Sequence, residues 1–237
     1  MAQVNREVTA IVLARGGSKR VPDKNLKHVG GISLLMRAIA AGNGAGLNVV
    51  VSTDSDLIAE KATKGGAQVV RRGTATASDG ATSEEALLEV VTVLGLAPEG
   101  EVLLLQPTSP LRTAADTKDF LKSWSRAKSL QPELRQGLAV VQELSDFWML
   151  SDKGIPARVR EGEPRREQDR KTWFRETGAL YVSEIRRLVE TRSLISGPLA
   201  LIPCHPRTAL DVNTPWDLRI AQSVALGVGA SALDLDV

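Results

Sequence analysis

The chain has 237 residues, a formal net charge of +2 and 43% hydrophobic residues. This length suits one large domain, or one domain with an insertion, and the nearly balanced charge argues against a globally basic nucleic-acid binder. With a single cysteine and two histidines, the sequence excludes an internal disulfide, a cysteine-based zinc site and a histidine-rich metal site.

The first seven residues are polar and do not resemble a signal peptide. No apolar run approaches the roughly 18 residues that a membrane-spanning helix needs. We therefore expect a cytoplasmic protein without a membrane span. Aromatic residues make up only 3% of the chain, so its core must be built mainly from Leu, Val and Ala.

A glycine-rich, basic loop follows the first apolar run. Val8–Leu13 predicts a buried strand and Ser33–Ala40 a helix. Between them, Gly16 and Gly17 let the backbone approach an anion and turn its N–H groups toward it. Five cationic side chains can neutralise phosphates there: Arg15, Lys19, Arg20, Lys24 and Lys27. The loop matches neither the Walker A pattern nor Gly-x-Gly-x-x-Gly, so we predict a phosphate-binding loop of another kind.

Strand patterns alternate with helical patterns as far as Glu143. Alternation of this kind implies right-handed βαβ units and ligands at the carboxyl ends of the strands. We therefore predict an α/β fold with a mostly parallel sheet flanked by helices. The further strands are expected at Gly46–Val51, Gln68–Val70, Glu101–Leu105 and Gly137–Val141, and helices at Asp56–Lys64, at Glu84–Leu94 and after the capping residues Thr113 and Asp116.

The alternation is interrupted at residues 144–176, which are irregular and rich in Arg, Glu and Gly. This segment holds half of the aromatic side chains, whereas disordered segments are poor in them. Because Arg and aromatic residues are enriched at interfaces, we interpret it as an insertion that forms an interface or a substrate lid. The alternation then resumes with strands at Gly178–Val182 and Leu199–Ile202 and helices at Ser183–Thr191 and Thr214–Leu226.

Polar side chains follow several of the predicted strands. Asp54 closes the second strand, and we expect it to anchor neighbouring loops by accepting backbone N–H groups. Arg72 follows the third strand and can hydrogen-bond to the edge of a base. Ser83 stands at a helix start, where it can either cap the helix or contact a base. Asp211, before the last helix, fits either a capping residue or a carboxylate ligand of Mg²⁺.

The loop Gln106-Pro-Thr-Ser-Pro-Leu-Arg112 follows a buried strand and contains two prolines. Prolines stiffen a turn, so we expect Gln106, Thr108 and Ser109 to point outward. These neutral hydrogen-bonding groups suit a polyhydroxylated ligand, and Arg112 adds a cation. A plain connecting loop is the alternative interpretation.

Five strings occur in the order that is typical of acylneuraminate cytidylyltransferases, the CMP-sialic acid synthetases, and the chain resembles that family over nearly its full length. They are Ala14-Arg-Gly-Gly-Ser-Lys-Arg-Val-Pro-Asp-Lys-Asn-Leu26, Val51-Ser-Thr-Asp54, Leu104-Leu-Gln-Pro-Thr-Ser-Pro-Leu-Arg112, Gly178-Ala-Leu-Tyr181 and Leu210-Asp-Val-Asn-Thr-Pro-Trp-Asp-Leu218. The resemblance implies transfer from CTP to a sialic-type (nonulosonic) acid, which gives a CMP-sugar and pyrophosphate. It also implies a single Rossmann-like nucleotide-diphospho-sugar transferase domain over residues 1–237 that dimerises through the insertion at 144–176.

The same resemblance implies roles for individual residues, with Arg15, Lys24 and Asp211 as the catalytic group. The nucleotide-binding set is Arg15, Gly16, Gly17, Ser18, Lys24, Asn25, Arg72, Ala81 and Ser83. The sugar-binding set is Gln106, Thr108, Ser109, Arg175 and Tyr181, with Arg175 serving the sugar carboxylate. Asp211 and Asn213 are the expected ligands of Mg²⁺. The expected partners are CTP, an acidic sugar and a second copy of the chain, with no nucleic acid and no membrane.

The sequence departs from the family pattern at two places. The usual Asp-x-Asp pair reads Asp211-Val-Asn213, and Asn213 offers Mg²⁺ a neutral carbonyl oxygen instead of a carboxylate. The usual Arg-x-Asn-Gly reads Arg175-Glu-Thr-Gly178, which removes an amide and adds Glu176. Two alternatives therefore stand beside the sialic-type acceptor. One is nucleotide transfer to a KDO-like acid, a sugar 1-phosphate or a phosphonate, and the other is a non-catalytic nucleotide-binding protein.

Overall fold

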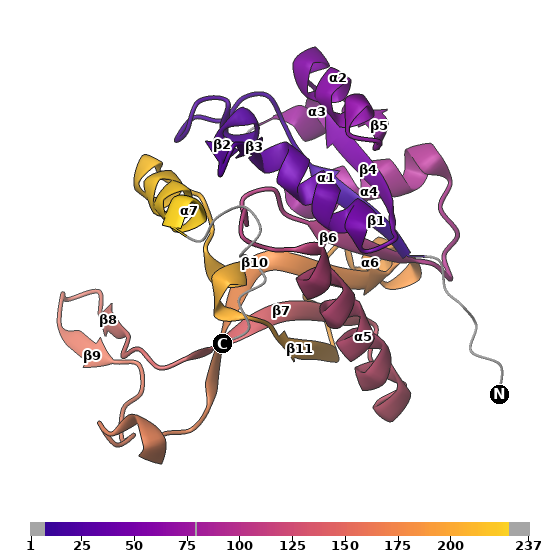
Figure 1. Cartoon of the computed structure of the whole chain (residues 1–237). Helices are drawn as coiled ribbons and strands as arrows, with labels where there is room; N and C mark the ends of the chain where they lie inside the picture. The colour runs from indigo at the N-terminus through magenta and orange to yellow at the C-terminus, as the bar shows by residue number, and fades with distance from the viewer. Residues whose placement is uncertain (1–7, 79, 228–237) are drawn as a thin grey trace.

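The computed structural model describes residues 8–78 and 80–227. Residues 1–7, on which the signal-peptide interpretation rests, lie outside this part of the chain. Within it, one central sheet has the strand order β11-β7-β10-β6-β1-β4-β5 (Figure 1). Its strands are β1 (Val8–Leu13), β4 (Asn48–Thr53), β5 (Gln68–Arg71), β6 (Glu101–Leu105), β7 (Gln136–Glu143), β10 (Trp173–Glu184) and β11 (Leu199–Pro203).

The sheet is mostly parallel, as predicted. In the described sheet only β10 runs against its neighbours, because it pairs antiparallel with both β6 and β7 while the other neighbouring strands pair parallel. The predicted bounds of β1 and β6 are confirmed, and both strands are almost wholly buried. Strands buried on both faces give continuous apolar runs, which is why these two were readable from the sequence.

Helices cover both faces of the sheet. On one face α1 (Leu34–Gly44), α2 (Asp56–Lys64) and α5 (Ala114–Leu130) pack into one hydrophobic cluster, and on the other face α4 (Ser83–Leu94) and α6 (Ile185–Thr191) pack into a second. A short helix, α3 (Thr74–Ala77), contacts α4. The last helix, α7 (Pro215–Gly227), packs away from the sheet on the small hairpin β2 (His28–Val29) and β3 (Ile32–Ser33). None of the helices in the described residues is long and apolar enough to cross a membrane.

Side-chain caps fix where several helices begin. Thr113 and Asp116 form the predicted reciprocal capping box of α5. The cap of α4 is Thr82, which accepts a hydrogen bond from the Glu85 N–H at 3.1 Å, so the capping option for Ser83 is wrong. Ser83 is instead the first residue of the helix, and its hydroxyl is not used for capping.

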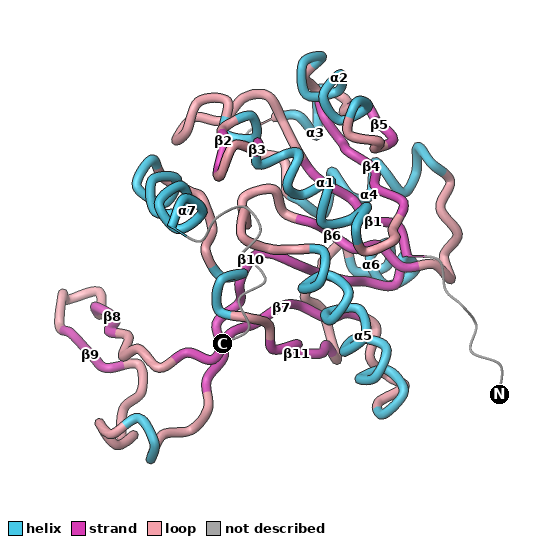
Figure 2. The backbone as a smooth tube through the Cα atoms, viewed as in Figure 1, coloured by secondary structure: helices cyan, strands magenta, loops and turns pink. Residues whose placement is uncertain are grey.

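The insertion leaves the sheet between β7 and β10 and projects to one side (Figures 1 and 2). It contains the hairpin β8 (Trp148–Leu150) and β9 (Pro156–Arg158) and a 3-10 turn at Glu167–Asp169. Residues 173–176, the last of the predicted insertion, pair antiparallel with residues 140–143, so β10 begins at Trp173 and not at Gly178 as predicted.

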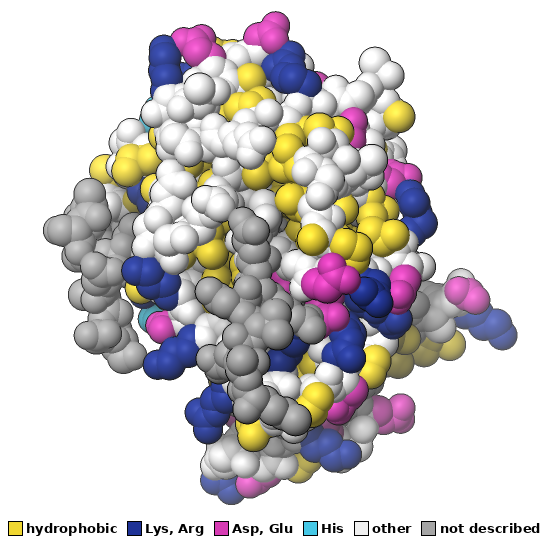
Figure 3. Space-filling view, turned by 90° about the vertical axis from the view of Figure 1, so that its right-hand side faces the viewer, with side chains coloured by type: hydrophobic (Ala, Val, Ile, Leu, Met, Phe, Trp, Pro, Cys, Tyr) yellow, Lys and Arg dark blue, Asp and Glu magenta, His cyan; other side chains and the backbone are white. Residues whose placement is uncertain are grey.

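The helix predicted at Ser183–Thr191 begins two residues later, at Ile185, because Ser183 and Glu184 still pair with β6. The face turned to the viewer in Figure 3 carries Lys and Arg side chains next to Asp and Glu side chains. Charges of both signs are therefore mixed on that face, as the small net charge predicts.

Candidate active site

A cavity of about 240 Å³ opens where the strand order reverses. From β1 the chain extends the sheet through β4 and β5, and then returns to place β6 on the other side of β1. Crevices at such switch points, beyond the carboxyl ends of the strands, are the usual ligand sites of open α/β sheets. The cavity is lined by nine of the predicted residues: Arg15, Ser18, Lys24, Asn25, Arg72, Ala81, Ser83, Gln106 and Thr108.

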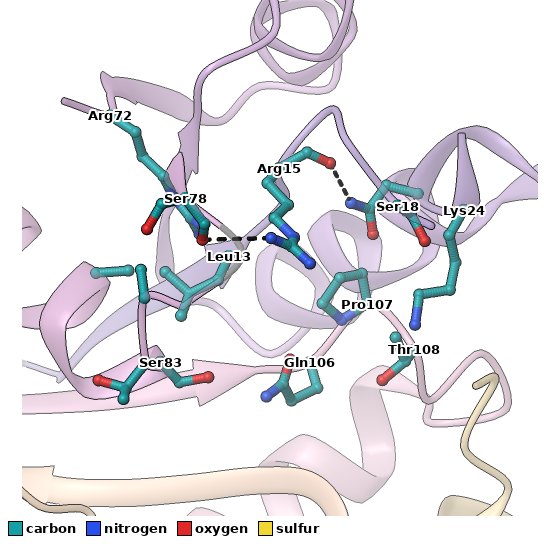
Figure 4. Close-up of a pocket in the computed structure, with 14 residues that line it drawn as sticks. Leu13, Arg15, Ser18, Lys24, Arg72, Ser78, Ser83, Gln106, Pro107 and Thr108 are labelled. Carbon is teal, nitrogen blue, oxygen red and sulfur yellow. Dashed lines mark hydrogen bonds between the residues drawn. The ribbon is translucent and has the colours of Figure 1, made fainter. Parts of the chain in front are cut away.

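The basic loop after β1 is held in place by hydrogen bonds between side chains and backbone groups. The Asn25 amide donates to the Arg15 carbonyl oxygen at 3.0 Å, and the Arg15 guanidinium donates to the Ser78 carbonyl oxygen at 3.3 Å (Figure 4). The Gly16 N–H donates to Asp54 Oδ1 at 2.8 Å, which confirms Asp54 as a loop anchor. Gly16 therefore cannot offer this N–H to an anion, and Gly17 is exposed outside the cavity lining. The loop residues that line the cavity are Arg15, Ser18, Lys24 and Asn25.

Arg72 reaches the cavity from the end of β5. Its Nε donates to Ser52 Oγ at 2.9 Å and its Nη1 to the Thr76 carbonyl oxygen at 3.5 Å. Burial lowers the pKa of Arg72, but a guanidinium titrates so far above neutrality that it stays charged. Ser83 lies across the cavity at the first turn of α4, where the helix dipole is positive. The part of the cavity between Arg72 and Ser83 is therefore lined by a cation, a hydroxyl group and backbone groups.

The loop after β6 divides into exposed and buried residues. Gln106 and Thr108 face the cavity below Arg15 and Lys24, as predicted (Figure 4). Ser109 does not point outward: it is 3% exposed, and its Oγ has no hydrogen-bond partner in the part of the chain that the structure describes. Arg112 is also buried and donates to the carbonyl oxygens of Gln106 and Ala179 at 3.0 and 2.8 Å. Burial lowers the pKa of Arg112 to about 10. This cation therefore ties the loop to β10 and does not face a ligand.

A second cavity, of about 500 Å³, contains the predicted metal ligands and one of the sugar-binding residues. Asn213 Nδ2 donates to Asp211 Oδ2 at 2.5 Å, so the two side chains lie together. Among the described residues, Asp211 Oδ1 is buried and has no hydrogen-bond partner. A carboxylate oxygen of this kind fits a hard cation such as Mg²⁺, whose other ligands are usually water and substrate phosphates, whereas Asn213 turns its amide nitrogen toward Asp211. The lining residues are Arg175, Glu176, Thr177, Gly178, Ala209, Leu210, Asp211, Asn213 and Asp217.

One backbone segment joins the two cavities. The Lys24 ammonium donates to the Val212 carbonyl oxygen at 3.0 Å, and the Val212 N–H donates to the Thr108 carbonyl oxygen at 2.8 Å. Burial lowers the pKa of Lys24, and Asp211 raises it in opposition. Residue 212 lies between Asp211 and Asn213, so both loops of the first cavity hold the candidate metal ligands.

Arg175, Thr177 and Tyr181 lie on β10, where the pairing with β7 shifts register between residues 176 and 181. Arg175 Nε contacts Glu143 Oε2 at 2.9 Å, so this guanidinium already has an acidic partner. Thr177 is buried, donates to the Ala139 carbonyl oxygen and accepts from the Ala179 N–H, so it stabilises the bulge and does not contact a ligand. Tyr181 lines neither cavity. Its hydroxyl donates to Glu176.

Two further contacts shape the site. Asp217 accepts from the backbone N–H groups of Asn213 and Thr214 at 3.0 and 2.7 Å, which fixes the backbone next to Asn213. The string Thr-x-x-Asp signals this cap in the sequence. Arg207, in the 3-10 turn Pro206–Ala209, donates to both carboxylate oxygens of Asp116. No local pattern reveals a pair that is 91 residues apart.

Comparison with known proteins assigns the chain to a family. The sequence model of the family described as "Cytidylyltransferase" matches residues 9–137, from β1 to the start of β7. The chain belongs to the cytidylyltransferase family. Residues 9–137 include all the lining residues of the first cavity, the last of which is Thr108. They do not include the second cavity, whose lining begins at Arg175.

Curated relatives of this cytidylyltransferase family member cover most of its length. The N-acylneuraminate cytidylyltransferase of Streptococcus agalactiae serotype III (strain NEM316) is 29% identical over 218 residues, which cover 87% of this chain and 50% of that protein. The N-acylneuraminate cytidylyltransferase of Oncorhynchus mykiss is 29% identical over 241 residues, with coverage of 97% and 52%. The chain thus spans about half the length of the curated relatives it matches.

Solved structures confirm the predicted fold class. CMP:2-keto-3-deoxy-manno-octonic acid synthetase complexed with CTP has a TM-score of 0.67 at 15% identity, over 93% of this chain and 99% of that chain. A 4-diphosphocytidyl-2C-methyl-D-erythritol synthase has a TM-score of 0.66 at 14% identity, over 94% and 100%. At these identities the likeness concerns the fold alone.

Proposed function

We propose that this chain transfers the cytidylyl group of CTP to an acidic sugar of the sialic type, giving a CMP-sugar and pyrophosphate. The observation that carries the proposal is the Val212 bridge, because it links a cavity lined by three cations to the Asp211–Asn213 pair. The names of the curated relatives and of the structural neighbours support cytidylyl transfer to an acidic sugar.

In this proposal the first cavity holds CTP. Arg15 and Lys24 neutralise its phosphates, with Ser18 and Asn25 beside them toward the ribose. Arg72, Ala81 and Ser83 surround the cytosine, where a guanidinium and a free hydroxyl suit its carbonyl oxygen and ring nitrogen. The acceptor's anomeric hydroxyl attacks the α-phosphate in line, and the fixed cations stabilise the charge that develops.

Mg²⁺ is the proposed cofactor, with Asp211 and Asn213 as its protein ligands. The orphaned Asp211 Oδ1 supports this assignment. When bound, the ion supplies positive charge to the phosphates and the leaving pyrophosphate. Asn213 contributes a neutral oxygen, so we expect a weaker metal affinity than a pair of carboxylates would give.

The acceptor lies between Gln106 and Thr108 of the first cavity and Arg175 of the second. Gln106 and Thr108 hydrogen-bond to its hydroxyl groups, and Arg175 attracts its carboxylate. Tyr181 acts on the acceptor site indirectly, because its hydroxyl donates a hydrogen bond to Glu176, which lines the second cavity. Ser109 takes no part, because it is buried away from both cavities.

The insertion forms a homodimer contact in this proposal, and the protein acts in the cytoplasm. Large apolar side chains are exposed along residues 147–155 and at Phe174, including Trp148 at 62% and Leu150 at 71%. An apolar surface of this kind is costly unless another protein covers it. Light scattering of the full chain, compared with a Trp148→Lys/Leu150→Lys variant, tests the contact. A monomeric wild-type protein at micromolar concentration would contradict it.

Pyrophosphate release tests the activity. Purified chain is mixed with Mg²⁺, with CTP, ATP, GTP or UTP, and with N-acetylneuraminate, 2-keto-3-deoxy-manno-octonate, a sugar 1-phosphate or a phosphonate. We expect release only with CTP and an acidic sugar. Asn213 in place of a carboxylate favours one rival, a nucleotide-binding protein without catalysis. CTP binding without pyrophosphate release from any acceptor would support that rival.

A further inference from the structure

Attack of a hydroxyl group on the α-phosphate releases a proton, and some group near the acceptor has to receive it. Histidines are poorly placed for this. His28 lies on the small hairpin, and the His205 Nδ1 already accepts a hydrogen bond from the Arg207 N–H. Lys24 is a donor to the Val212 carbonyl oxygen. The candidates that remain are the carboxylates that line the second cavity, together with Glu143, which contacts the lining residue Arg175.

Three of these carboxylates are already occupied. Asp217 accepts from the N–H groups of Asn213 and Thr214 and from the Thr214 hydroxyl. Asp211 pairs with Asn213 through Oδ2, and its Oδ1 is buried at the proposed metal site. Glu143 is bonded to Arg175 and to the Ser145 N–H. Each would lose a structural or metal contact on taking up a proton.

Glu176 differs from them. It is exposed on β10 and lines the second cavity together with Asp211. Its Oε1 accepts from the Tyr181 hydroxyl, and within residues 8–78 and 80–227 no donor is bonded to its Oε2. Burial, together with Glu176, raises the pKa of Tyr181, so the phenol keeps its proton and remains a donor. Tyr181 thus holds Oε1 of this carboxylate in place, and Oε2 is available to accept a proton.

The backbone brings Glu176 to the proposed metal ligand. A side chain at Gly178 would place its Cβ 3.9 Å from Asp211 Oδ2, so β10 passes directly beside that carboxylate two residues after Glu176. Gly178 has a φ of 74°, a left-handed conformation that favours glycine and bends the strand at this point. The bulge therefore positions Glu176 at the edge where acceptor and α-phosphate would meet.

We propose that Glu176 is the general base of the reaction and that Tyr181 is its positioning residue, an inference that rests on the proposed function. The acceptor hydroxyl oxygen forms a bond to the α-phosphorus of CTP. The bond from that phosphorus to the bridging oxygen breaks, and its electron pair leaves with pyrophosphate. The hydroxyl proton passes to Glu176 Oε2. General bases contribute roughly 10²–10⁴-fold to rate.

The test measures initial rates of pyrophosphate release with CTP, Mg²⁺ and whichever of N-acetylneuraminate or 2-keto-3-deoxy-manno-octonate supports turnover. Glu176→Gln keeps the side-chain shape and removes the base, so kcat should fall about 10²–10⁴-fold, while the acceptor KM and the Kd for CTP change little. Glu190→Gln, an exposed site on α6, is the matched control and should retain wild-type kcat. Tyr181→Phe should lower kcat less than Glu176→Gln does, with an unchanged Kd for CTP.

Chemical rescue separates a base from a structural residue. Formate added to Glu176→Gly should restore part of the lost kcat, and it should not accelerate Glu190→Gly. A Glu176→Gln variant with near-normal kcat, or one whose only defect is a raised acceptor KM, would contradict the role of Glu176 and leave the proposed function intact. Wild-type protein that releases no pyrophosphate with any acceptor would contradict both.

Discussion

The Lys24 ammonium donates a hydrogen bond to the carbonyl oxygen of Val212 at 3.0 Å, across 188 residues of sequence. Val212 lies between Asp211 and Asn213, and its N–H is bonded to the Thr108 carbonyl oxygen. Lys24 thus belongs to the predicted phosphate-binding loop and also contacts the loop of the candidate metal ligands. In the proposed function, this contact couples nucleotide binding to the placement of the metal.

The first prediction concerns Lys24. Lys24→Met removes the cation and the hydrogen bond to Val212, and we expect kcat/KM for CTP to fall at least about 100-fold, a size typical of losing one charge-stabilising group. Lys27→Met, in the same loop but outside the cavity lining, is the control and should stay near wild type. Initial rates of pyrophosphate release measure both. Equal effects of the two substitutions would mean that only the overall charge of the loop matters.

The second prediction concerns the metal. Asn213→Asp replaces a neutral oxygen by a carboxylate next to the orphaned Asp211 Oδ1, so half-maximal activity should require several-fold less Mg²⁺. Asp211→Ala should abolish activity at any Mg²⁺ concentration, and EDTA should abolish it in the wild type. A Mg²⁺ titration of the three proteins gives the comparison. An unchanged midpoint in Asn213→Asp would place residue 213 away from the ion.

The third prediction concerns the ion pair of Arg175 with Glu143. A substrate carboxylate has to compete with Glu143 for this guanidinium, because the two side chains contact at 2.9 Å. Hydrogen bonding from Ser145, chiefly from its backbone N–H, lowers the pKa of Glu143, and Arg175 lowers it further, so the competitor stays ionised near neutral pH. Glu143→Gln should therefore lower the KM for an acidic acceptor several-fold.

The matched measurement uses Arg175→Ala, which should raise the same KM, while the Kd for CTP stays constant in both variants. Exposed ion pairs contribute only about 0.2–1 kcal/mol to stability, so neither substitution should shift the Tm much. If Glu143→Gln raised the acceptor KM instead, Glu143 would be helping Arg175 to bind and not competing with it.

Residues near strand ends show what the sequence could predict. The loop after β1, Asp54 and the Gln106–Thr108 stretch were placed correctly, because polar residues after buried parallel strands gather at one edge of a sheet. The fold class was confirmed because alternating strands and helices predict a mostly parallel sheet, and the family was confirmed by the model that matches residues 9–137. The antiparallel β10 was predicted too short, because its first residues are half-buried (Trp173) or exposed (residues 174–176) and show no alternating pattern.

The remaining differences come from tertiary contacts. Arg112 looked like a ligand-facing cation, yet two backbone carbonyl oxygens hold it in the interior. Glu176 had no pattern of its own, and its role emerged only when the bulge brought it to Tyr181 and the Asp211 cavity. Contacts between residues far apart in sequence, such as Lys24 with Val212, leave no local signal.

The last prediction concerns Arg112, which the structure assigns to stability. Arg112→Leu keeps much of the side-chain volume but removes one of the two donors of each carbonyl oxygen, because the Gln106 oxygen still accepts from the Ser109 N–H and the Ala179 oxygen from the Gln106 N–H. A hydrogen bond from a charged donor contributes about 1.5–3 kcal/mol, and removal of a buried charge offsets part of the loss, so we expect a decrease of about 2–4 kcal/mol in the free energy of unfolding. Urea denaturation measures this loss, with Arg126→Leu on the exposed side of α5 as the control.

Because the loop after β6 also presents Gln106 and Thr108, the acceptor KM should rise in folded Arg112→Leu. Wild-type stability in this variant would show that the backbone donors Ser109 and Gln106 satisfy both carbonyl oxygens, and that the loop after β6 does not need the cation.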